Sequence, residues 1–552
     1  MNDAGIIDLV PARLRQEWGR RGWYPNRSVF QMFRQHAERH PGKAAVLASD
    51  GTAIRYGELL DKALRLAASL KARGIVAGDV VAYQLPNTWH CCAIDLAAAA
   101  LGAVVAPFPP GRGRLDLESL LKRCGARAVV VAPADGEIDP CDLIESLRPT
   151  VLSLRLLIVD GDGDGDARAG WHAFDALLQA EPIAPDALPH VCPDSPVRFL
   201  ISSGTESEPK LVAYSHNALM GGRGRFLQCL HPEGETFRGL FLVPLGSAFG
   251  ASATFGALCW LGGSIALLPK FDTAQAIAAI GALRPTHVLG VPTMLQRMAA
   301  DPALGEIDRS SLVALVSGGS MIDEASVARC KRAFGCGFIS LYGSADGVNC
   351  HNALGDAVIF NRVGRPNPSI CELQIVDETG QRIPSGEVGE IVARGPMSPM
   401  QYVNAPDLDA RYRDSGGWVR TGDLGSIDGD GYLVLAGRKK DIIIRGGANI
   451  STVQIENLAT AHPDVVSAAC VPVPDLDLGQ RVCLCLTVRD GAERPSLSDI
   501  NAFLRRSGLE VNKLPEYLRY VRRFPLTPAG KVDKKELAAE VAFVARGGAA
   551  VC

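Results

Sequence analysis

The chain has 552 residues, of which 47% are hydrophobic and 21% charged, and its formal net charge is −3. This length exceeds what a single hydrophobic core organises, so two or more domains are expected. The small net charge argues against a general binder of nucleic acid or of membrane surfaces. The N-terminus has no signal-peptide pattern, and the fifteen cysteines include no Cys-x-x-Cys pair, so we expect a reduced, cytoplasmic protein.

Short apolar segments alternate with helical patterns along the chain. The sequence predicts helices at Tyr56 to Arg73, from Asn87 onward and at Asp116 to Arg123, and strands at Lys43 to Ala48, Val80 to Leu85, Ala103 to Pro107, Ala128 to Ala132, His287 to Val291, Val313 to Ser317 and Phe338 to Leu341. Apolar strands separated by helices indicate parallel sheets that helices cover on both faces. The most apolar stretch, Cys91 to Pro109, contains Asp95 and Gly102, which favours a buried helix and strand over a membrane span.

The fold class is therefore predicted as α/β. We expect a large N-terminal domain of parallel-rich sheets covered by helices, and a small C-terminal α/β domain. The composition changes at the charged segment Gly437-Arg438-Lys439-Lys440-Asp441, so the domains are predicted to span residues 1–437 and 438–552. In such sheets, ligand loops lie at the carboxyl ends of the strands.

One such loop, rich in hydroxyl groups, reads Ser202-Ser203-Gly204-Thr205-Glu206-Ser207-Glu208-Pro209-Lys210. Its backbone N–H groups and hydroxyls can bind phosphate oxygens, and Lys210 adds a positive charge. The same letters, taken alone, also fit an ordinary Ser/Gly turn.

Three further segments could bind other parts of a nucleotide. In Tyr342-Gly343-Ser344-Ala345-Asp346, the ring can stack on adenine and the carboxylate can hold Mg²⁺. Asp423 lies in a Gly-bounded turn and can accept hydrogen bonds from two ribose hydroxyls, to which Arg438 can add a contact. Lys531 lies on a short turn that contains Pro528 and Gly530. Individually, these residues could also be loop scaffolding.

In their order along the chain, these motifs resemble the adenylate-forming superfamily, which includes acyl-CoA synthetases, peptide-synthetase adenylation domains and beetle luciferases. The resemblance covers nearly the whole chain. The matching segments are Arg55 to Leu59, Leu101 to Val105, Ser202 to Lys210, Ser317 to Ser320, Tyr342 to Asp346, Gly389 to Pro396, Gly416 to Asp423, Gly437 to Asp441 and Pro525 to Asp533.

This resemblance implies an acid–thiol ligase, an ATP-dependent carboxylic acid:CoA ligase that acts through an acyl-adenylate intermediate. The implied cofactors are ATP, Mg²⁺ and coenzyme A, or the phosphopantetheine of a carrier protein. The implied partners are a small-molecule carboxylic acid and either CoA or an acyl carrier protein, with no nucleic acid and no membrane span.

The family's residue roles are carried over to the matching positions. The implied catalytic residues are Lys531, which acts in adenylation, and Lys440, the hinge about which a mobile C-terminal domain turns for thioester formation. Asp346 is the implied metal ligand. The implied ATP or AMP ligands are Ser202, Ser203, Gly204, Thr205, Lys210, Gly318, Gly319, Ser320, Tyr342, Gly343, Ser344, Ala345, Asp423 and Arg438. The implied pantetheine or CoA ligands are Gly446, Gly447, Ala448 and Asn449.

The chain departs from the family pattern in the phosphate loop. Glu206, Ser207 and Glu208 replace the usual T-G-x, and Leu211 replaces the last glycine of the motif. Two carboxylates beside a triphosphate lower its affinity unless they point outward or help to hold Mg²⁺. In the Tyr342 motif, Ala345 before the acid is typical of the aryl-acid branch.

The resemblance places the acyl pocket at Gly246, Ser247, Ala248, Phe249 and Gly250, with Ser247 where the family has a gate histidine. Small side chains leave volume, which favours a bulky, alicyclic, aromatic or medium-chain acid over acetate. Ala248 stands where enzymes that read an ortho-hydroxyl carry Asn, which weighs against a salicylate-type acid. The alternative is that small residues merely allow close helix packing.

Two other functions remain open from the sequence. One is a stand-alone adenylating enzyme that loads an acyl or aryl carrier protein, since both acceptors share the pantetheine arm. The other is a degenerate family member that binds nucleotide or acyl ligand without turnover, which the altered phosphate loop and Ser247 would fit. The presence of Asp423, Arg438 and Lys531 argues against the degenerate alternative.

Overall fold

The computed structural model describes residues 5–110, 114–133, 139–161, 169–201, 210–232, 234–359, 361–445, 448–475, 477–489, 491–527 and 531–546. The chain forms two compact units. The first comprises Met1–Val358, Val363–Leu373 and Val392–Thr421, and the second comprises Ile359–Arg362, Gln374–Ile391 and Gly422–Cys552. The predicted boundary between residues 437 and 438 falls inside the second unit, and it stays a prediction.

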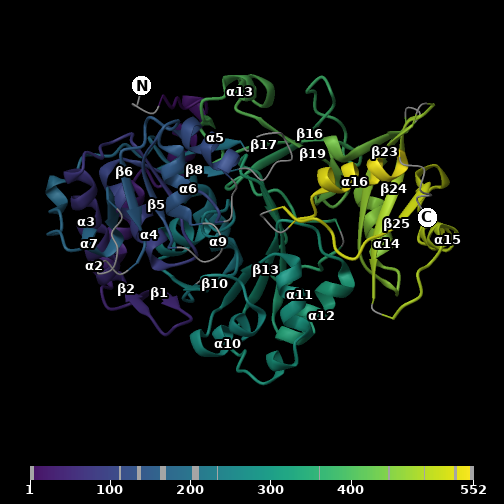
Figure 1. Ribbon diagram of the computed structural model, residues 1–552, viewed down its shortest axis with the longest axis horizontal. Helices are drawn as coiled ribbons and strands as arrows, with labels where there is room; N and C mark the ends of the chain where they lie inside the picture. The colour runs from purple at the N-terminus through teal and green to yellow at the C-terminus, as the bar shows by residue number, and fades with distance from the viewer. Residues whose placement is uncertain are drawn as a thin grey trace. The chain divides into compact units, whose positions relative to one another are not determined.

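Two eight-stranded sheets organise the first unit (Figure 1). One has the order β15 (Asn349–His351), β14 (Gly337–Gly343), β13 (Ala314–Gly318), β12 (His287–Gly290), β10 (Arg238–Phe241), β11 (Ser264–Leu267), β1 (Ala44–Ala48) and β2 (Ala53–Arg55). The other has the order β18 (Gln401–Tyr402), β9 (Leu211–Ser215), β8 (Pro196–Ile201), β4 (Val104–Pro107), β3 (Val80–Gln84), β5 (Ala126–Val131), β6 (Leu156–Val159) and β7 (Trp171–Ala173). The inner strands pair in parallel, whereas β2, β15, β9 and β18 are antiparallel to their neighbours.

Helices cover these sheets, as Figure 1 shows for α10, α11 and α12 beside β10 and β13. The α-helices of the first unit are α1 (Ala12–Arg20), α2 (Val29–Arg39), α3 (Tyr56–Ala72), α4 (Trp89–Leu101), α5 (Arg114–Cys124), α6 (Pro140–Leu147), α7 (Phe174–Leu177), α8 (His216–Ala218), α9 (Arg225–Leu230), α10 (Thr273–Leu283), α11 (Pro292–Ala300), α12 (Glu324–Phe334) and α13 (Pro406–Tyr412). Two π-helical segments, η2 (Leu219–Gly224) and η3 (Ala253–Trp260), lie against each other.

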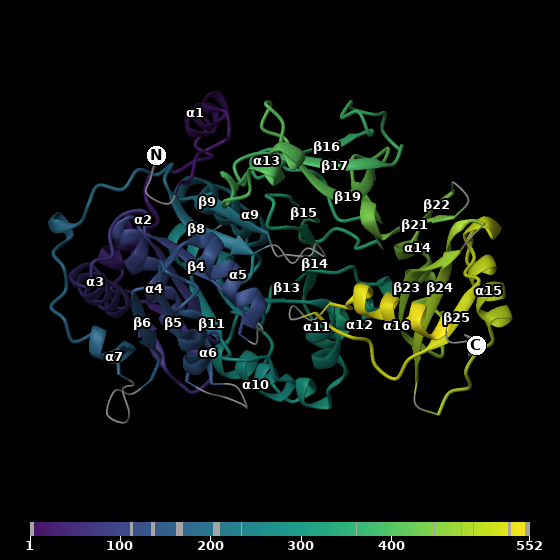
Figure 2. The same cartoon turned by 45° about the horizontal axis from the view of Figure 1, so that its top comes forward.

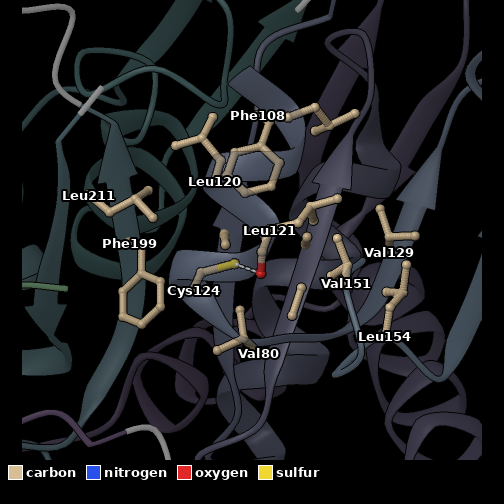
Figure 3. Packing of buried hydrophobic residues seen from close by; sticks show 14 of the residues in the cluster. Val80, Phe108, Leu120, Leu121, Cys124, Val129, Val151, Leu154, Phe199 and Leu211 are labelled. Carbon is tan, nitrogen blue, oxygen red and sulfur yellow. Dashed lines mark hydrogen bonds between the residues drawn. The ribbon is translucent and has the colours of Figure 1, made fainter. Parts of the chain in front are cut away.

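The core of the second sheet explains why its strands read as continuous apolar runs. Every residue of β3 and β4 is buried. Their side chains pack with those of α5, and Figure 3 shows Val80, Leu120, Leu121 and Phe199 in this cluster. Folding therefore removes the apolar surface of both sheet faces from water, and this burial stabilises the parallel arrangement.

The predicted strands match β1, β3, β4, β5, β12, β13 and β14, and the predicted α/β class is confirmed. The apolar stretch from Cys91 forms the buried helix α4 and the strand β4. No helix within the described residues combines the length and apolarity needed to cross a membrane.

The second unit carries most of a four-stranded sheet and a complete five-stranded sheet (Figure 2). The four-stranded sheet has the order β16 (Glu372–Val376), β17 (Gly389–Arg394), β19 (Val419–Ile427) and β20 (Leu433–Arg438). The five-stranded sheet has the order β22 (Ala448–Ser451), β21 (Ile442–Arg445), β24 (Gly479–Val488) and β23 (Val465–Asp475), with β25 (Tyr517–Tyr520) parallel to β24.

Side-chain alternation along β23 divides the five-stranded sheet into two faces. Cys470 packs in a cluster with residues of α14 (Thr452–Thr460) and α15 (Leu497–Arg506). Its neighbour Val471 packs in a separate cluster with Leu537 and Val541 of α16 (Lys534–Arg546). Helices therefore cover both faces of this sheet.

Candidate active site

Three predicted segments of the first unit lie at one sheet edge. Gly318 ends β13, Tyr342 lies near the end of β14, and the segment of residues 245–250, here called the acyl segment, follows β10. Because these strands are parallel, their carboxyl ends share the same edge. A Cβ atom placed at Gly318 would lie 3.3 Å from the Phe249 ring, so the acyl segment contacts the Gly318 turn.

The motif from Tyr342 to Asp346 is held by local hydrogen bonds. The Ser344 hydroxyl accepts a 3.0 Å bond from the Asp346 N–H, and the Ala345 carbonyl accepts a 2.8 Å bond from the Tyr214 hydroxyl. Tyr342 is buried, whereas Gly343 is exposed. These two bonds therefore hold the backbone of the motif at the sheet edge.

Asp346, the predicted metal ligand, is a buried carboxylate whose Oδ1 accepts a 2.7 Å hydrogen bond from the Tyr402 hydroxyl. Tyr402 lies on β18, far along the chain, and its own N–H donates to Asp409. Sequence reasoning missed Tyr402 because no motif surrounds it. Within the described residues, no three His, Cys, Asp or Glu side chains are arranged to hold a metal ion by themselves.

Lys210 joins the same neighbourhood of the first unit. Its Nζ lies 3.6 Å from the centroid of the Tyr412 ring and 5.5 Å from that of Tyr402. Cation–π contacts of this kind restrain the lysine head. The rest of the predicted phosphate loop, Ser202, Ser203, Gly204 and Thr205 with Glu206, Ser207 and Glu208, lies outside the described residues, so its phosphate-binding role stays a prediction.

The acyl segment is a tight turn. The Ser247 hydroxyl accepts a 2.9 Å hydrogen bond from the Gly250 N–H, and a Cβ atom at Gly250 would overlap the Pro244 carbonyl. Ser247 and Gly250 therefore shape the turn. A Cβ atom at Gly246 would lie 3.3 Å from Pro107 Cβ, so a side chain there would start against the end of β4. Gly246, Ser247, Ala248 and Phe249 are half-buried, and their role in holding an acyl group stays a prediction.

A buried ion pair supports the acyl segment from beneath. Arg198 Nη1 donates to both Asp95 oxygens at 2.8 and 2.7 Å, and Arg198 Nη2 donates to the Leu245 carbonyl at 2.6 Å. Asn87 accepts a 2.8 Å bond from the Leu245 N–H. Both charged side chains are about 1% exposed, so the acyl segment is held by a hydrogen bond from an ion pair that is buried away from solvent.

The second unit brings together three other predicted residues. Asp423 on β19 pairs in register with Arg438 on β20, and Arg438 Nε lies 3.1 Å from Asp423 Oδ1. Asp423 is buried. The proximity of these two side chains follows from the antiparallel pairing, which places residues fifteen apart in sequence directly opposite each other.

Lys531 lies close enough to this pair to respond to its charges. The pKa of Lys531 is lowered to about 8, chiefly by burial and also by the positive charge of Arg438, while the negative charge of Asp423 acts in the opposite direction. The turn is closed by a 2.7 Å bond from the Thr527 N–H to the Lys531 carbonyl. The next helix, α16, is anchored by a 2.6 Å ion pair between Lys534 and Glu456 of α14.

The remaining predicted residues of this unit are less fully described. Lys440 lies in a short 3₁₀ helix, Lys439–Asp441, which connects β20 to β21. Ala448 and Asn449 begin β22, while Gly446 and Gly447 lie outside the described residues. Their pantetheine role and the hinge role of Lys440 stay predictions.

Comparison with known proteins places these motifs in a family. Residues 33–403 match the family described as AMP-binding enzyme, and residues 454–531 match the AMP-binding enzyme C-terminal domain. The chain is 31% identical over 528 residues to a 2-hydroxy-7-methoxy-5-methyl-1-naphthoate–CoA ligase of Streptomyces carzinostaticus, covering 94% of each chain. It is 30% identical to the salicyl-AMP ligase / salicyl-S-ArCP synthetase of Mycobacterium tuberculosis, covering 97% of this chain and 95% of that protein.

A solved structure shares the fold. The amide bond synthetase McbA from Marinactinospora thermotolerans has a TM-score of 0.81 and 29% identity, covering 93% of this chain and 99% of that one. The predicted superfamily and enzyme class are confirmed by these matches. The chain therefore belongs to the family of AMP-binding enzymes, the adenylate-forming acid–thiol ligases.

Proposed function

We propose that this protein is a carboxylic acid:CoA ligase that activates a bulky, ring-bearing or medium-chain acid through an acyl adenylate. The observation that carries this proposal is the grouping of Asp423, Arg438 and Lys531 in the second unit. A buried carboxylate beside a guanidinium suits a ribose, and a half-buried lysine nearby suits the charge that develops on an adjacent phosphate.

In the first half-reaction, a carboxylate oxygen of the acid attacks the α-phosphorus of ATP, and pyrophosphate leaves with the electrons of the broken P–O bond. Asp423 accepts hydrogen bonds from the ribose hydroxyls, which orients the nucleotide. Lys531 offsets negative charge on the α-phosphate as the P–O bonds form and break. Tyr342 and the exposed backbone beside it provide the adenine surface.

The donor set of Asp346 fits Mg²⁺, which usually takes one or two protein carboxylates together with substrate phosphates. The carboxylate is buried and oriented by the Tyr402 hydroxyl. When bound, Mg²⁺ would supply positive charge against the phosphate oxygens. The residues of this chain would then position that charge through the Tyr402–Asp346 contact.

In the second half-reaction, a thiol sulfur attacks the acyl carbonyl, AMP leaves, and the thiol proton passes to solvent or a base. We propose coenzyme A as the acceptor. A carrier-protein arm is the second candidate, because the similarity to a CoA ligase and to a salicyl-S-ArCP synthetase is almost equal. Both routes consume ATP, and we propose the cytoplasm as the location of the enzyme.

The acid class rests on the small residues of the acyl segment. Gly246, Ser247 and Ala248 carry small side chains at half-buried positions, and the Phe249 ring lies beside Gly318. We propose that these small side chains leave volume for a bulky acid, which would fill it better than acetate does.

The test is a panel of acids with ATP, Mg²⁺ and coenzyme A, in which the thioester is measured by mass. The panel includes acetate, medium-chain linear acids, alicyclic acids and benzoates. We expect turnover with ring-bearing or medium-chain acids and little with acetate. Turnover of acetate alone would overturn the acid class, and adenylation without CoA thioester would favour the carrier-protein acceptor.

A further inference from the structure

Two buried guanidinium groups donate to backbone carbonyls of the acyl segment. Arg198 Nη2 donates to Leu245, and Arg223 Nη1 donates to Ala248. Both arginines are buried, with relative exposures of 0% and 5%. They differ in how their charge is compensated.

Arg198 is neutralised by Asp95, which accepts two hydrogen bonds from it. Among the residues that the structure describes, no carboxylate pairs with Arg223 in this way. Within the part of the chain that the structure describes, its Nε and Nη2 atoms have no hydrogen-bond partner, and it forms no ion pair with a described acid. A buried charge without a partner destabilises a protein unless a ligand supplies the partner.

The position of Arg223 points to that ligand. Its guanidinium carbon lies 5.7 Å from the centroid of the Tyr214 ring. The Tyr214 hydroxyl in turn donates a hydrogen bond to the Ala345 carbonyl, in the motif from Tyr342 to Asp346. Since Arg223 also contacts Ala248, its head lies between the acyl segment and the motif from Tyr342 to Asp346. Both segments belong to the first unit.

The helix that carries Arg223 is fixed in place. In η2, Gly222 and Gly224 flank Arg223. A Cβ atom at Gly222 would lie 2.6 Å from Met397 Cβ, and a Cβ atom at Gly224 would overlap the Trp260 ring. Such close approach needs glycine. The Arg223 side chain therefore extends from a closely packed helix at a fixed position, as expected of a side chain that determines specificity.

We propose that Arg223 binds a second acceptor group on the acid substrate, a carboxylate or carbonyl other than the reacting carboxylate, and selects acids that carry it. This inference rests on the proposed function. The reacting carboxylate is not the partner, because a guanidinium that holds it would withdraw the electron density needed to attack phosphorus. The second acceptor group would satisfy Nε and Nη2, which form the fork geometry typical of carboxylate recognition.

The test compares Arg223→Met with the wild type on three acids. The first is the best ring acid of the panel above, and the others are analogues of it with an added carboxylate or acetyl group. The measured quantity is the ratio of kcat/KM for substituted and unsubstituted acid in acid-dependent pyrophosphate exchange. We expect the wild type to prefer one substituted acid by about 10- to 100-fold and Arg223→Met to lose this preference.

The two substituted acids distinguish the possible acceptors. Arg223→Lys, which keeps the charge without the fork, should retain part of a preference for the added carboxylate and little of one for the acetyl group. An equal ratio in wild type and Arg223→Met would overturn the inference while the proposed function stands. Failure of the wild type to activate any acid in the panel would overturn the proposed function instead.

Thermal unfolding gives a readout independent of turnover. Without ligand, Arg223→Met should melt at or above the wild-type temperature, because it removes an uncompensated charge. The matched control Arg198→Met should melt lower, because it strands Asp95. The preferred acid should raise the wild-type melting temperature more than that of Arg223→Met. A lower melting temperature for Arg223→Met, with the same shift on adding acid, would contradict the inference.

Discussion

Burial and the neighbouring charge of Arg438 lower the pKa of Lys531 to about 8, and a lysine assists phosphate chemistry only while it is protonated. Below pH 8 most of the enzyme carries the cation, and above it the cation is lost. We therefore expect kcat/KM for ATP in adenylation, which reports the free enzyme, to fall as pH rises through about 8. Lys531→Arg keeps its charge throughout this range, so its remaining activity should not fall there. A fall at the same pH in Lys531→Arg would assign the titration to another group.

The role of Asp423 is tested through the nucleotide. Asp423→Ala removes an acceptor from two ribose hydroxyls, and each hydrogen bond to a charged group contributes about 1.5–3 kcal/mol. The KM for ATP should therefore rise at least about tenfold, and the KM for the acid should change much less. Steady-state kinetics with each substrate varied in turn measures both constants. A normal KM for ATP in a folded variant would refute the assignment.

At the residue scale, the sequence predicts roles for residues that lie in motifs and gives no signal for residues that do not. Asp423 and Arg438 were predictable because a Gly-bounded turn and a charged segment mark them. Tyr402 and Arg223 lie in segments without a motif, and only the folded chain brings them to Asp346 and Ala248. The departures at Glu206 and Glu208 lie outside the described residues, so their effect on phosphate binding stays a prediction.

Among the structural elements, helix α4 and strand β8 are joined by the Asp95–Arg198 pair. Asp95→Ala leaves a buried, uncompensated guanidinium, which should destabilise the protein by about 3–5 kcal/mol. The double variant Asp95→Leu with Arg198→Met removes both charges and should cost much less. It also removes the donor to Leu245, so the KM for the acid should rise.

Urea unfolding and acid kinetics on the three proteins separate stability from positioning. A loss below about 1 kcal/mol for Asp95→Ala would mean that water or a neighbour compensates Arg198. An unchanged KM for the acid in the double variant would remove the pair from the support of the acyl segment.

The sheets were predictable because their inner strands are apolar on both faces, a pattern that helices rarely show at that length. The π-helical segments were not. Gly221, Gly222 and Gly224 lower intrinsic helix propensity, and η2 forms because glycine lets it approach Tyr24, Met397 and Trp260 closely. Long-range packing of this kind leaves no local signal.

In the whole molecule, the C-terminal part is expected to serve both half-reactions. Lys440→Pro fixes φ in the turn between β20 and β21 and should hinder rotation there. Pyrophosphate exchange should survive while thioester output falls. Lys440→Ala keeps the backbone free and should retain thioester output. An unchanged overall rate in Lys440→Pro would remove this turn from the hinge role.

We propose that the chain uses Lys531 to make an acyl adenylate. The most direct measurement is acid-dependent exchange of labelled pyrophosphate into ATP, in wild type and Lys531→Ala, alongside thioester formation from a supplied acyl adenylate. We expect exchange to require acid and to fall by about 100- to 1,000-fold in Lys531→Ala, while thioester formation survives. Nucleotide binding without exchange for any acid, or equal loss of both half-reactions in Lys531→Ala, would contradict it.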